Sequence, residues 1–242
     1  MTLDVRLFPC LNDNYGFLLR DAATGQVATV DTPDAEAVLA ELERSGWGRL
    51  DLILNTHWHP DHTQGNARLK AATGCEIVGP EEVRRAASLD RVVRGGDVVQ
   101  LGETTLAVTE TPGHTLGHIV YRDAASGQAF VGDTLFVMGC GRLFEGTAEQ
   151  MWTSLSTLAA WPDETVIWCA HEYTAANARF TLSLDDRPEM AARAAAVFAA
   201  RERGQPTVPT TIGAEKAFNP FLRARDASDF AARRAAKDSF AG

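Results

Sequence analysis

Four side chains of types that commonly bind metal ions lie close together in the stretch THWHPDH. The four are His57, His59, Asp61 and His62. His57 and His59 are two residues apart, so in an extended segment both imidazoles point to the same side and can reach one cation. Pro60 then bends the chain and lets the next two side chains reach a second point nearby. This spacing has few structural uses, and we interpret it as a metal-binding run.

The run alone cannot fill the roughly four to five positions around each of two ions, so other segments have to supply ligands. Three strand ends offer them: His114 in TPGHTLGH, Asp133 in FVGDTLF and His171 in WCAHEYT. Each of these residues taken singly would more often be structural, but beside the run we expect all three to bind metal. A shared water or hydroxide would complete the site. The expected ligands are His57, His59 and His114 for one ion, Asp61, His62 and His171 for the other, and Asp133 bridging both.

Two further polar residues lie beside these candidates in the sequence. His118 follows His114 by four residues, and we interpret it as a packing or orienting residue because the expected ligand sets are already full. Asp31 also ends a predicted strand. We expect it to orient a ligand or loop rather than to bind metal.

Composition limits the classes of protein that the chain can be. The 242 residues are 45% hydrophobic and 23% charged, which is typical of a soluble globular protein. A net charge of -9 disfavours broad nucleic-acid binding, although local basic spots for a small anion remain compatible with it. No apolar run is long enough for a membrane span, and the N-terminus does not resemble a secretory signal. We therefore expect a cytoplasmic monomer that binds neither nucleic acid nor membrane, with its four cysteines reduced and buried.

Apolar periodicity and turn formers predict alternating strands and helices. Strands are expected at residues 3–8, 15–21, 26–31, 50–55, 97–101, 104–111, 118–123, 128–133 and 165–170. Helices are expected at residues 34–46, 63–74, 147–161 and 172–184. Asp34 and Gly46 are the expected caps of the first helix. From about Asp186 the sequence is rich in Ala and Arg and predicts helices without a convincing strand.

The strands come in two sets, each followed by helices. This order fits two packed sheets covered by helices, but periodicity alone does not exclude a doubly wound sheet. The change in pattern near residues 170–185 predicts a catalytic domain over residues 1–172. A helical domain would then cover residues 173–242.

The motifs together resemble the metallo-β-lactamase superfamily, and within it glyoxalase II, the hydroxyacylglutathione hydrolases. THWHPDH, TPGHTLGH, GDTLF and HEYT carry the broader resemblance. The narrower one is carried by LNDNYGFLL at the start, GDTLFVMGCGRLFEGT in the middle and RRAAKDSF at the end. The resemblance implies an αββα sandwich with a C-terminal helical subdomain. It also implies two divalent metal ions, for which zinc is our first choice and iron or manganese an alternative.

The resemblance further implies a glutathione thioester as substrate, with the C-terminal helices closing over the glutathione. Tyr173 would contact the substrate, and Arg234 and Lys237 would bind the glycine carboxylate, although their spacing alone would indicate only a solvated helix face. Arg142 and Phe144 stand where many members carry Lys and Tyr. Because Phe144 lacks the hydroxyl, one hydrogen bond to glutathione has to be missing or replaced.

The expected reaction is hydrolysis of S-D-lactoylglutathione to glutathione and D-lactate, the second step of methylglyoxal detoxification. A metal-bridging hydroxide would attack the thioester, with Asp61 and Asp133 as the catalytic carboxylates. The alternatives are a general thioesterase, a persulfide dioxygenase, a β-lactamase, a nuclease or a metal-binding protein without turnover. The acidic net charge disfavours the nuclease, and the C-terminal residues disfavour the β-lactamase.

Overall fold

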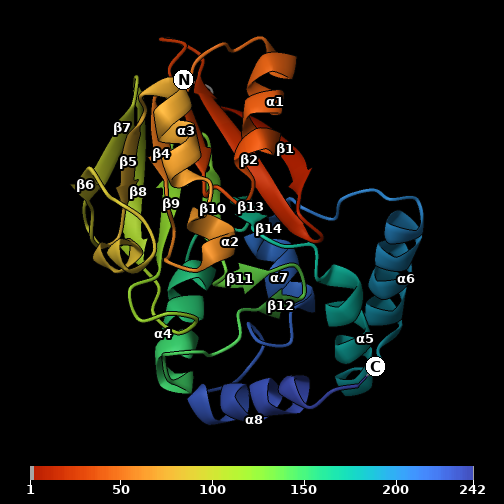
Figure 1. Cartoon of the computed structure of the whole chain (residues 1–242). Coiled ribbons are helices and arrows are strands. Elements are labelled where there is room, and N and C mark those ends of the chain that lie inside the picture. Colours follow the sequence, from red (N-terminus) through yellow and green to blue (C-terminus); the bar gives the residue numbers. More distant parts are fainter. Residues whose placement is uncertain (1–2, 242) are drawn as a thin grey trace. The chain divides into compact units, whose positions relative to one another are not determined.

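The computed structural model describes residues 3–241, which divide into two compact units (Figure 1). The first unit runs up to Glu110 and also contains Gly117–Gly132. The second unit contains Thr111–Leu116 and everything from Asp133 onward. Each unit is therefore assembled from segments that are not contiguous in the sequence.

A six-stranded mixed sheet forms one layer of the first unit. Its strands, in spatial order, are β1 (Leu3–Cys10), β2 (Asn14–Asp21), β3 (Val27–Val30), β4 (Leu52–Leu54), β5 (Glu76–Gly79) and β6 (Arg91–Val92). The pairs β1–β2 and β2–β3 are antiparallel, and the pairs from β3 to β6 are parallel. Strand β4 is buried at every residue, as its short and continuous apolar sequence predicts.

Two helices and two short helical turns connect these strands. They are α1 (Ala35–Ser45), α2 (Pro60–Thr63), α3 (Asn66–Thr73) and the 3₁₀ turn η1 (Glu81–Arg85). Asp34 caps α1 by accepting hydrogen bonds from two backbone N–H groups of its first turn, and Gly46 ends it with a φ of 70°. Both predicted caps are thus confirmed. Helix α1 packs on β1, β2 and α3, so the helices cover one face of the sheet (Figure 1).

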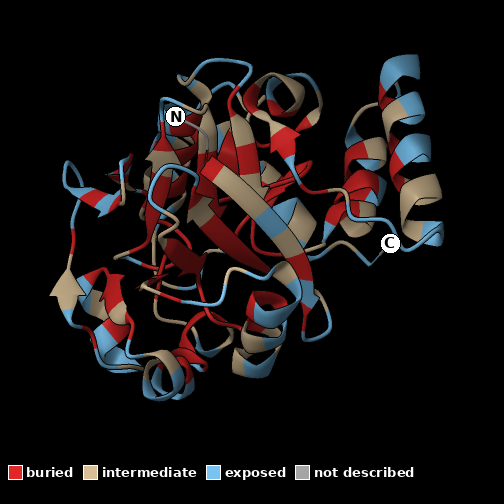
Figure 2. Ribbon diagram, turned by 90° about the horizontal axis from the view of Figure 1, so that it is seen from above, coloured by how far each residue is buried: buried red, intermediate tan, exposed pale blue. Residues whose placement is uncertain are grey.

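A second run of four strands in the first unit is antiparallel throughout. Its spatial order is β10 (Gln128–Gly132), β9 (Ile119–Asp123), β8 (Thr104–Glu110) and β7 (Val98–Leu101). In β8, buried and exposed residues alternate, so one face of this layer is directed to the interior. Phe17 of β2 meets Phe130 of β10 with ring centroids 5.9 Å apart. The two strand layers therefore pack face to face, which decides against a doubly wound sheet. In Figure 2 the strands are mostly red and the helices carry pale blue stripes.

The second unit is mainly helical. Its elements are β11 (Leu135–Phe136), β12 (Gly139–Cys140), α4 (Ala148–Ala159), β13 (Val166–Cys169), α5 (Thr174–Leu184), α6 (Pro188–Glu202), β14 (Thr210–Thr211), α7 (Ile212–Phe218) and α8 (Ala227–Asp238). Helix α4 begins with a capping box between Thr147 and Gln150. β11 and β12 form a short antiparallel hairpin, and β13 pairs antiparallel with β14.

Aromatic rings form the core beneath the C-terminal helices. Phe180 contacts Phe221 and Phe240, with centroid distances of 6.0 and 5.5 Å, and Phe221 contacts Phe230 at 5.8 Å. The prediction of a helical region after Asp186 is confirmed, but it missed β14. That strand has only two residues and exists by pairing with β13. Within residues 3–241, no helix is both long enough and apolar enough to cross a membrane.

Candidate active site

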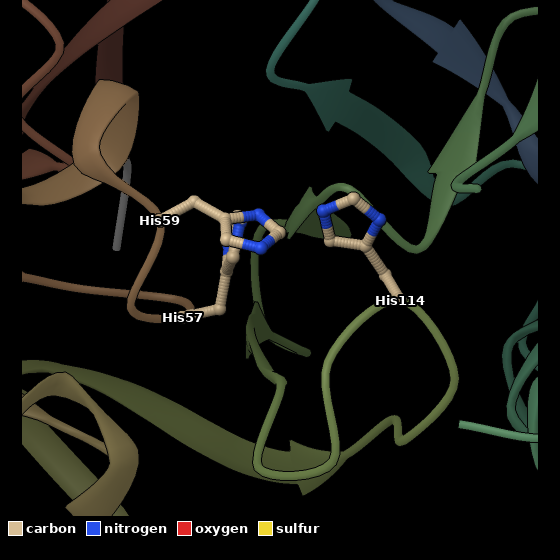
Figure 3. A group of neighbouring side chains, drawn as sticks. All are labelled: His57, His59 and His114. Carbon is tan, nitrogen blue, oxygen red and sulfur yellow. The ribbon is translucent and has the colours of Figure 1, made fainter. Parts of the chain in front are cut away.

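The histidine run of the first unit begins in the loop between β4 and α2, which carries His57 and His59, and continues into α2, which carries Asp61 and His62. Pro60 opens α2 and turns the chain directly after His59. The Nε2 atom of His57 lies 3.0 Å from the Nδ1 atom of His59, so two ring nitrogens meet on one side of the loop. Figure 3 shows these two imidazoles next to each other, with His114 carried by a different loop. His57 is completely buried.

Asp31, at the end of β3, holds this loop in place. Its carboxylate accepts hydrogen bonds from the backbone N–H and the hydroxyl of Thr56, both at 2.8 Å, and its Oδ2 lies 2.8 Å from His62 Nδ1. A carboxylate on Nδ1 keeps that nitrogen protonated and leaves the Nε2 lone pair of His62 for a metal ion. This is the orienting contact expected of Asp31. Asp31, His57 and His62 also offer ligand atoms within 4.8 Å of one another.

Two other residues of the first unit support the run. The ring of His118 stacks on that of His57, with centroids 4.8 Å apart, which agrees with the packing role expected for it. Asn14 was missed by the sequence analysis. Its buried amide donates a 3.0 Å hydrogen bond to Asp61 Oδ2 and thereby fixes the partly exposed carboxylate. The motif LNDNYGFLL, in which Asn14 starts β2, was the available signal.

In the second unit, Asp133 lies between two histidines. Its Oδ2 is 3.2 Å from His114 Nε2, and its Oδ1 is 3.3 Å from His171 Nε2. All three side chains are buried. The Nδ1 atom of His114 lies 2.8 Å from the carbonyl oxygen of Arg142, which fixes the tautomer with a lone pair on Nε2. Each carboxylate oxygen therefore has its own imidazole, as a bridging ligand requires.

These separations suit a coordination shell. Ligand atoms about 2.0–2.1 Å from a tetrahedral zinc ion are about 3.3 Å apart. The observed pairs are separated by 3.0 Å for His57 and His59, 3.2 Å for His114 and Asp133, and 3.3 Å for His171 and Asp133. Imidazole nitrogens and carboxylate oxygens are suitable donors for zinc, iron or manganese. The residues therefore fit divalent metal ions.

A cavity of about 220 Å³ in the second unit is lined by four of the five predicted substrate residues: Arg142, Tyr173, Arg234 and Lys237. The Tyr173 ring stacks on His171, with centroids 4.7 Å apart and planes 4° from parallel. The fifth residue, Phe144, does not line the cavity. It is 61% exposed, and its ring centroid lies 5.3 Å from that of His114.

The two cations of the C-terminal motif have contacts of their own. Arg234 is 7% exposed and donates to the Cys140 carbonyl oxygen at 3.1 Å and to Asp238 Oδ1 at 2.8 Å. Lys237 donates to the Ala176 carbonyl oxygen at 3.0 Å, and burial lowers the pKa of its ammonium group. Arg142 is the most exposed of the three lining cations, and its Nε is 3.5 Å from Asp238 Oδ1.

Asp238 was quoted in the sequence motif, but no role was predicted for it. It is the one residue that contacts two of the lining cations among the described ion pairs. Cys140 also lines the cavity, and burial raises the pKa of its thiol to about 11. Because the thiol stays protonated near neutral pH, it is a poor nucleophile. All four cysteines are free and buried, as expected.

Two sequence-family models match the chain. One describes the metallo-beta-lactamase superfamily and matches residues 23–171, and the other describes the hydroxyacylglutathione hydrolase C-terminus and matches residues 172–240. The hydroxyacylglutathione hydrolase of Maricaulis maris is 55% identical over 92% of this chain and 87% of its own length. The chain belongs to the hydroxyacylglutathione hydrolase family. A second member, from Erythrobacter litoralis, is 47% identical over 98% of this chain and 100% of its own length.

Solved structures with similar folds were also found for this member of the hydroxyacylglutathione hydrolase family. ETHE1 from Myxococcus xanthus superposes with a TM-score of 0.74 at 27% identity, covering 99% of this chain and 91% of that one. The B3 metallo-beta-lactamase BLEG-1 has a TM-score of 0.70 at 21% identity, covering 90% and 99%. The predicted metallo-β-lactamase fold with C-terminal helices is therefore confirmed.

Proposed function

We propose that this protein hydrolyses S-D-lactoylglutathione, or a similar 2-hydroxyacylglutathione, to glutathione and the free hydroxy acid. The observation that carries the proposal lies within the second unit. There, Asp133 contacts two histidines, and the stacked ring of Tyr173 leads from one of them, His171, to a cavity lined by three cations. Glutathione has two carboxylates and one ammonium group, so a cationic cavity suits it. Relatives of similar length and about half identical in sequence are named hydroxyacylglutathione hydrolases, which supports the same activity.

The proposed metal ligands are those that the sequence predicts. One ion is assigned to His57, His59 and His114, the other to Asp61, His62 and His171, and Asp133 is assigned to both. Zinc remains the first choice of metal. Bound there, the ions would supply Lewis acidity toward a water molecule and the thioester carbonyl.

The side chains themselves are assigned the remaining tasks. Asp61, held by Asn14, accepts a hydrogen bond from the attacking water and orients its lone pair toward the carbonyl carbon. Asp133 places one carboxylate oxygen beside His114 Nε2 and the other beside His171 Nε2, so the three side chains present their lone pairs to the same site. The leaving group is a thiolate, and since a free thiol has a pKa of about 8.5, no separate general acid is required.

Substrate binding is assigned to the C-terminal helices and the loop after β12. Arg234 and Lys237 are the cations proposed to bind the glycine carboxylate, and Arg142 lines the same cavity. The buried Arg234 also fixes the Cys140 backbone and Asp238. We therefore propose a catalytic domain over residues 1–172 and a glutathione-binding domain over residues 173–242. We also propose a cytoplasmic monomer, a compartment that suits four unpaired cysteines.

The decisive experiment combines metal analysis with an activity assay. The purified protein should contain divalent metal and should abolish the thioester absorbance of S-D-lactoylglutathione, releasing one glutathione thiol for each thioester cleaved. Oxygen uptake with glutathione persulfide is the control for a dioxygenase, and we expect none. A metal-loaded protein that leaves the thioester intact would overturn the proposal.

A further inference from the structure

The hairpin formed by β11 and β12 contacts a proposed metal ligand of the second unit and lines the substrate cavity through Phe136 and Cys140. It starts two residues after Asp133 and ends two residues before Arg142. Its Phe136 contacts the ring of His171 at 5.8 Å and the ring of Tyr173 at 5.3 Å, both edge to face. A shift of this hairpin would therefore move a proposed ligand and a proposed substrate residue together.

The turn of the hairpin has an unusual backbone. Met138 has a φ of 56°, a left-handed conformation that residues other than glycine rarely adopt. Such a conformation persists only when surrounding contacts hold it. Two helices contact this turn: the N–H of Met138 donates a 2.8 Å hydrogen bond to Glu215 Oε2 of α7, and Asn177 of α5 donates a 3.0 Å hydrogen bond to the Val137 carbonyl oxygen.

Glu215 is a buried carboxylate that is surrounded by donors. Besides Met138, it accepts hydrogen bonds from the hydroxyl of Thr210 at 2.7 Å and from Asn219 Nδ2 at 2.9 Å. Asn219, also fully buried, extends the contact to the hairpin by donating to the Phe136 carbonyl at 3.2 Å and the Gly139 carbonyl at 2.9 Å. Burying a carboxylate is costly unless such donors satisfy it. The hydrogen bonds of Glu215 therefore compensate for the burial of its charge and at the same time hold the backbone of the hairpin turn.

We propose that Glu215, together with Asn219, is a positioning residue for the thioester hydrolysis. The inference rests on the proposed function. The pair fixes the backbone of the β11–β12 turn, and Phe136 then holds His171 and Tyr173 at the separations that the substrate requires. Neither Glu215 nor Asn219 lines the cavity, so both act through the hairpin.

Glu215→Gln tests this role because it keeps the side-chain shape, removes the negative charge that faces three donors, and replaces one of the two acceptor oxygens with an N–H₂ group that cannot accept a hydrogen bond. We expect amide hydrogen exchange in residues 135–141 to accelerate at least about tenfold, because the acceptor of the Met138 N–H is weakened. We expect KM for S-D-lactoylglutathione to rise about tenfold through displacement of Tyr173, and kcat to change by less than about threefold, since His171 is only one of seven proposed metal ligands. Metal content should stay at the wild-type level.

Glu41→Gln is the matched control. Glu41 is likewise a buried glutamate, but it lies on α1 of the first unit and pairs with Arg44 and Arg6. This variant should lower Tm without changing exchange in residues 135–141 or KM. If Glu215→Gln behaves in the same way, with a lower Tm but wild-type KM and exchange, Glu215 is merely structural and the inference is overturned.

Two further outcomes have defined consequences. If Glu215→Gln does not fold, Asn219→Ser takes its place, because it removes the donors to Phe136 and Gly139 and is judged by the same exchange and KM criteria. If the wild-type protein does not hydrolyse the thioester, the proposed function fails. The inference is then judged by exchange and by glutathione titration, and an unchanged dissociation constant in Glu215→Gln overturns it.

Discussion

The two units bring metal-binding side chains together in different ways. The first unit places His57, His59 and His62 within six consecutive residues, on a loop and the helical turn α2 that follows it, so their proximity follows from the covalent chain. The second unit brings His114, Asp133 and His171 together from three separate segments, so their proximity depends on the fold. A local run can thus be recognised in a sequence, whereas a dispersed set requires the folded unit or a family resemblance.

The C-terminal region also differs from the rest of the chain in charge. Residues 173–242 contain eleven Lys and Arg residues against eight Asp and Glu, although the net charge of the whole chain is -9. The basic excess suits an anionic substrate. The overall charge conceals it, which shows that charge has to be assessed by region.

The largest expected effect comes from removing one ligand from each unit. His59→Ala and Asp133→Ala should each lower activity by about a thousandfold or more, because metal binding and water activation depend on them. Metal content measured by atomic emission should fall in both variants. Circular dichroism checks that each variant is folded. Should only Asp133→Ala lose metal, the local run of the first unit is not a ligand set.

The next largest effect is on stability, and it comes from the hydrogen bonds that each unit makes to a carboxylate. Burial alone would raise the pKa of Asp21 in the first unit, but hydrogen bonds from Thr104 and Thr24 lower it from 3.8 to about 2. Because the folded pKa is the lower one, ionised Asp21 stabilises the fold above pH 4, and this stability is lost as pH falls toward 2. Asp21→Asn should lower the free energy of unfolding by about 2 kcal/mol at pH 7 and by little near pH 2. Urea denaturation at both pH values measures the difference.

A carboxylate of the second unit is the comparison for that experiment. Hydrogen bonds from the guanidinium groups of Arg187 and Arg223 hold the pKa of Asp185 well below its usual range. Salt should weaken the effect of Asp185→Asn, since charged partners are screened, but not that of Asp21→Asn, whose partners are neutral. Equal salt dependence of the two variants would contradict this distinction.

The parts of the fold that sequence predicts well are those with local causes. The caps of α1 and the continuous apolar strand β4 are determined by neighbouring residues, and both are observed as expected. β14 could not be predicted, because two threonines become a strand only by pairing with β13. Periodicity likewise left two packed sheets and a doubly wound sheet equivalent. The strand orders of two separate sheets, with Phe17 of one against Phe130 of the other, distinguish them.

The candidate site shows the same limit. The histidine run indicated metal without any structure, and the strand-end position of Asp31 indicated its orienting role. Asn14 and Asp238 act through side chains that are distant in sequence, and no spacing rule connects them to Asp61 or Arg142. Their assignment needed the folded units.

A smaller effect is expected at the substrate cavity. Lys237→Ala should raise KM for glutathione thioesters about tenfold and leave kcat nearly unchanged, because it removes an interaction remote from the reacting bond. Steady-state kinetics measure both constants. Lys216→Ala is the control, since Lys216 pairs with Asp163 and does not line the cavity. A large loss of kcat at unchanged KM would mean that Lys237 takes part in the chemical step. Substrate binding by the cavity and catalysis by the metal ligands would then not be separate.

The smallest expected effect tests the exposed ring beside His114. Phe144→Tyr adds a hydroxyl that can donate a hydrogen bond to glutathione, and one such bond contributes about 1 kcal/mol, or about fivefold in affinity. KM for S-D-lactoylglutathione should therefore fall about fivefold with kcat unchanged. Stability should not change, because the ring is 61% exposed. Phe144→Leu is the control and should show no such gain. If the tyrosine variant also shows none, the substrate does not reach this ring, and binding is confined to the cavity lined by Arg142, Tyr173 and Lys237.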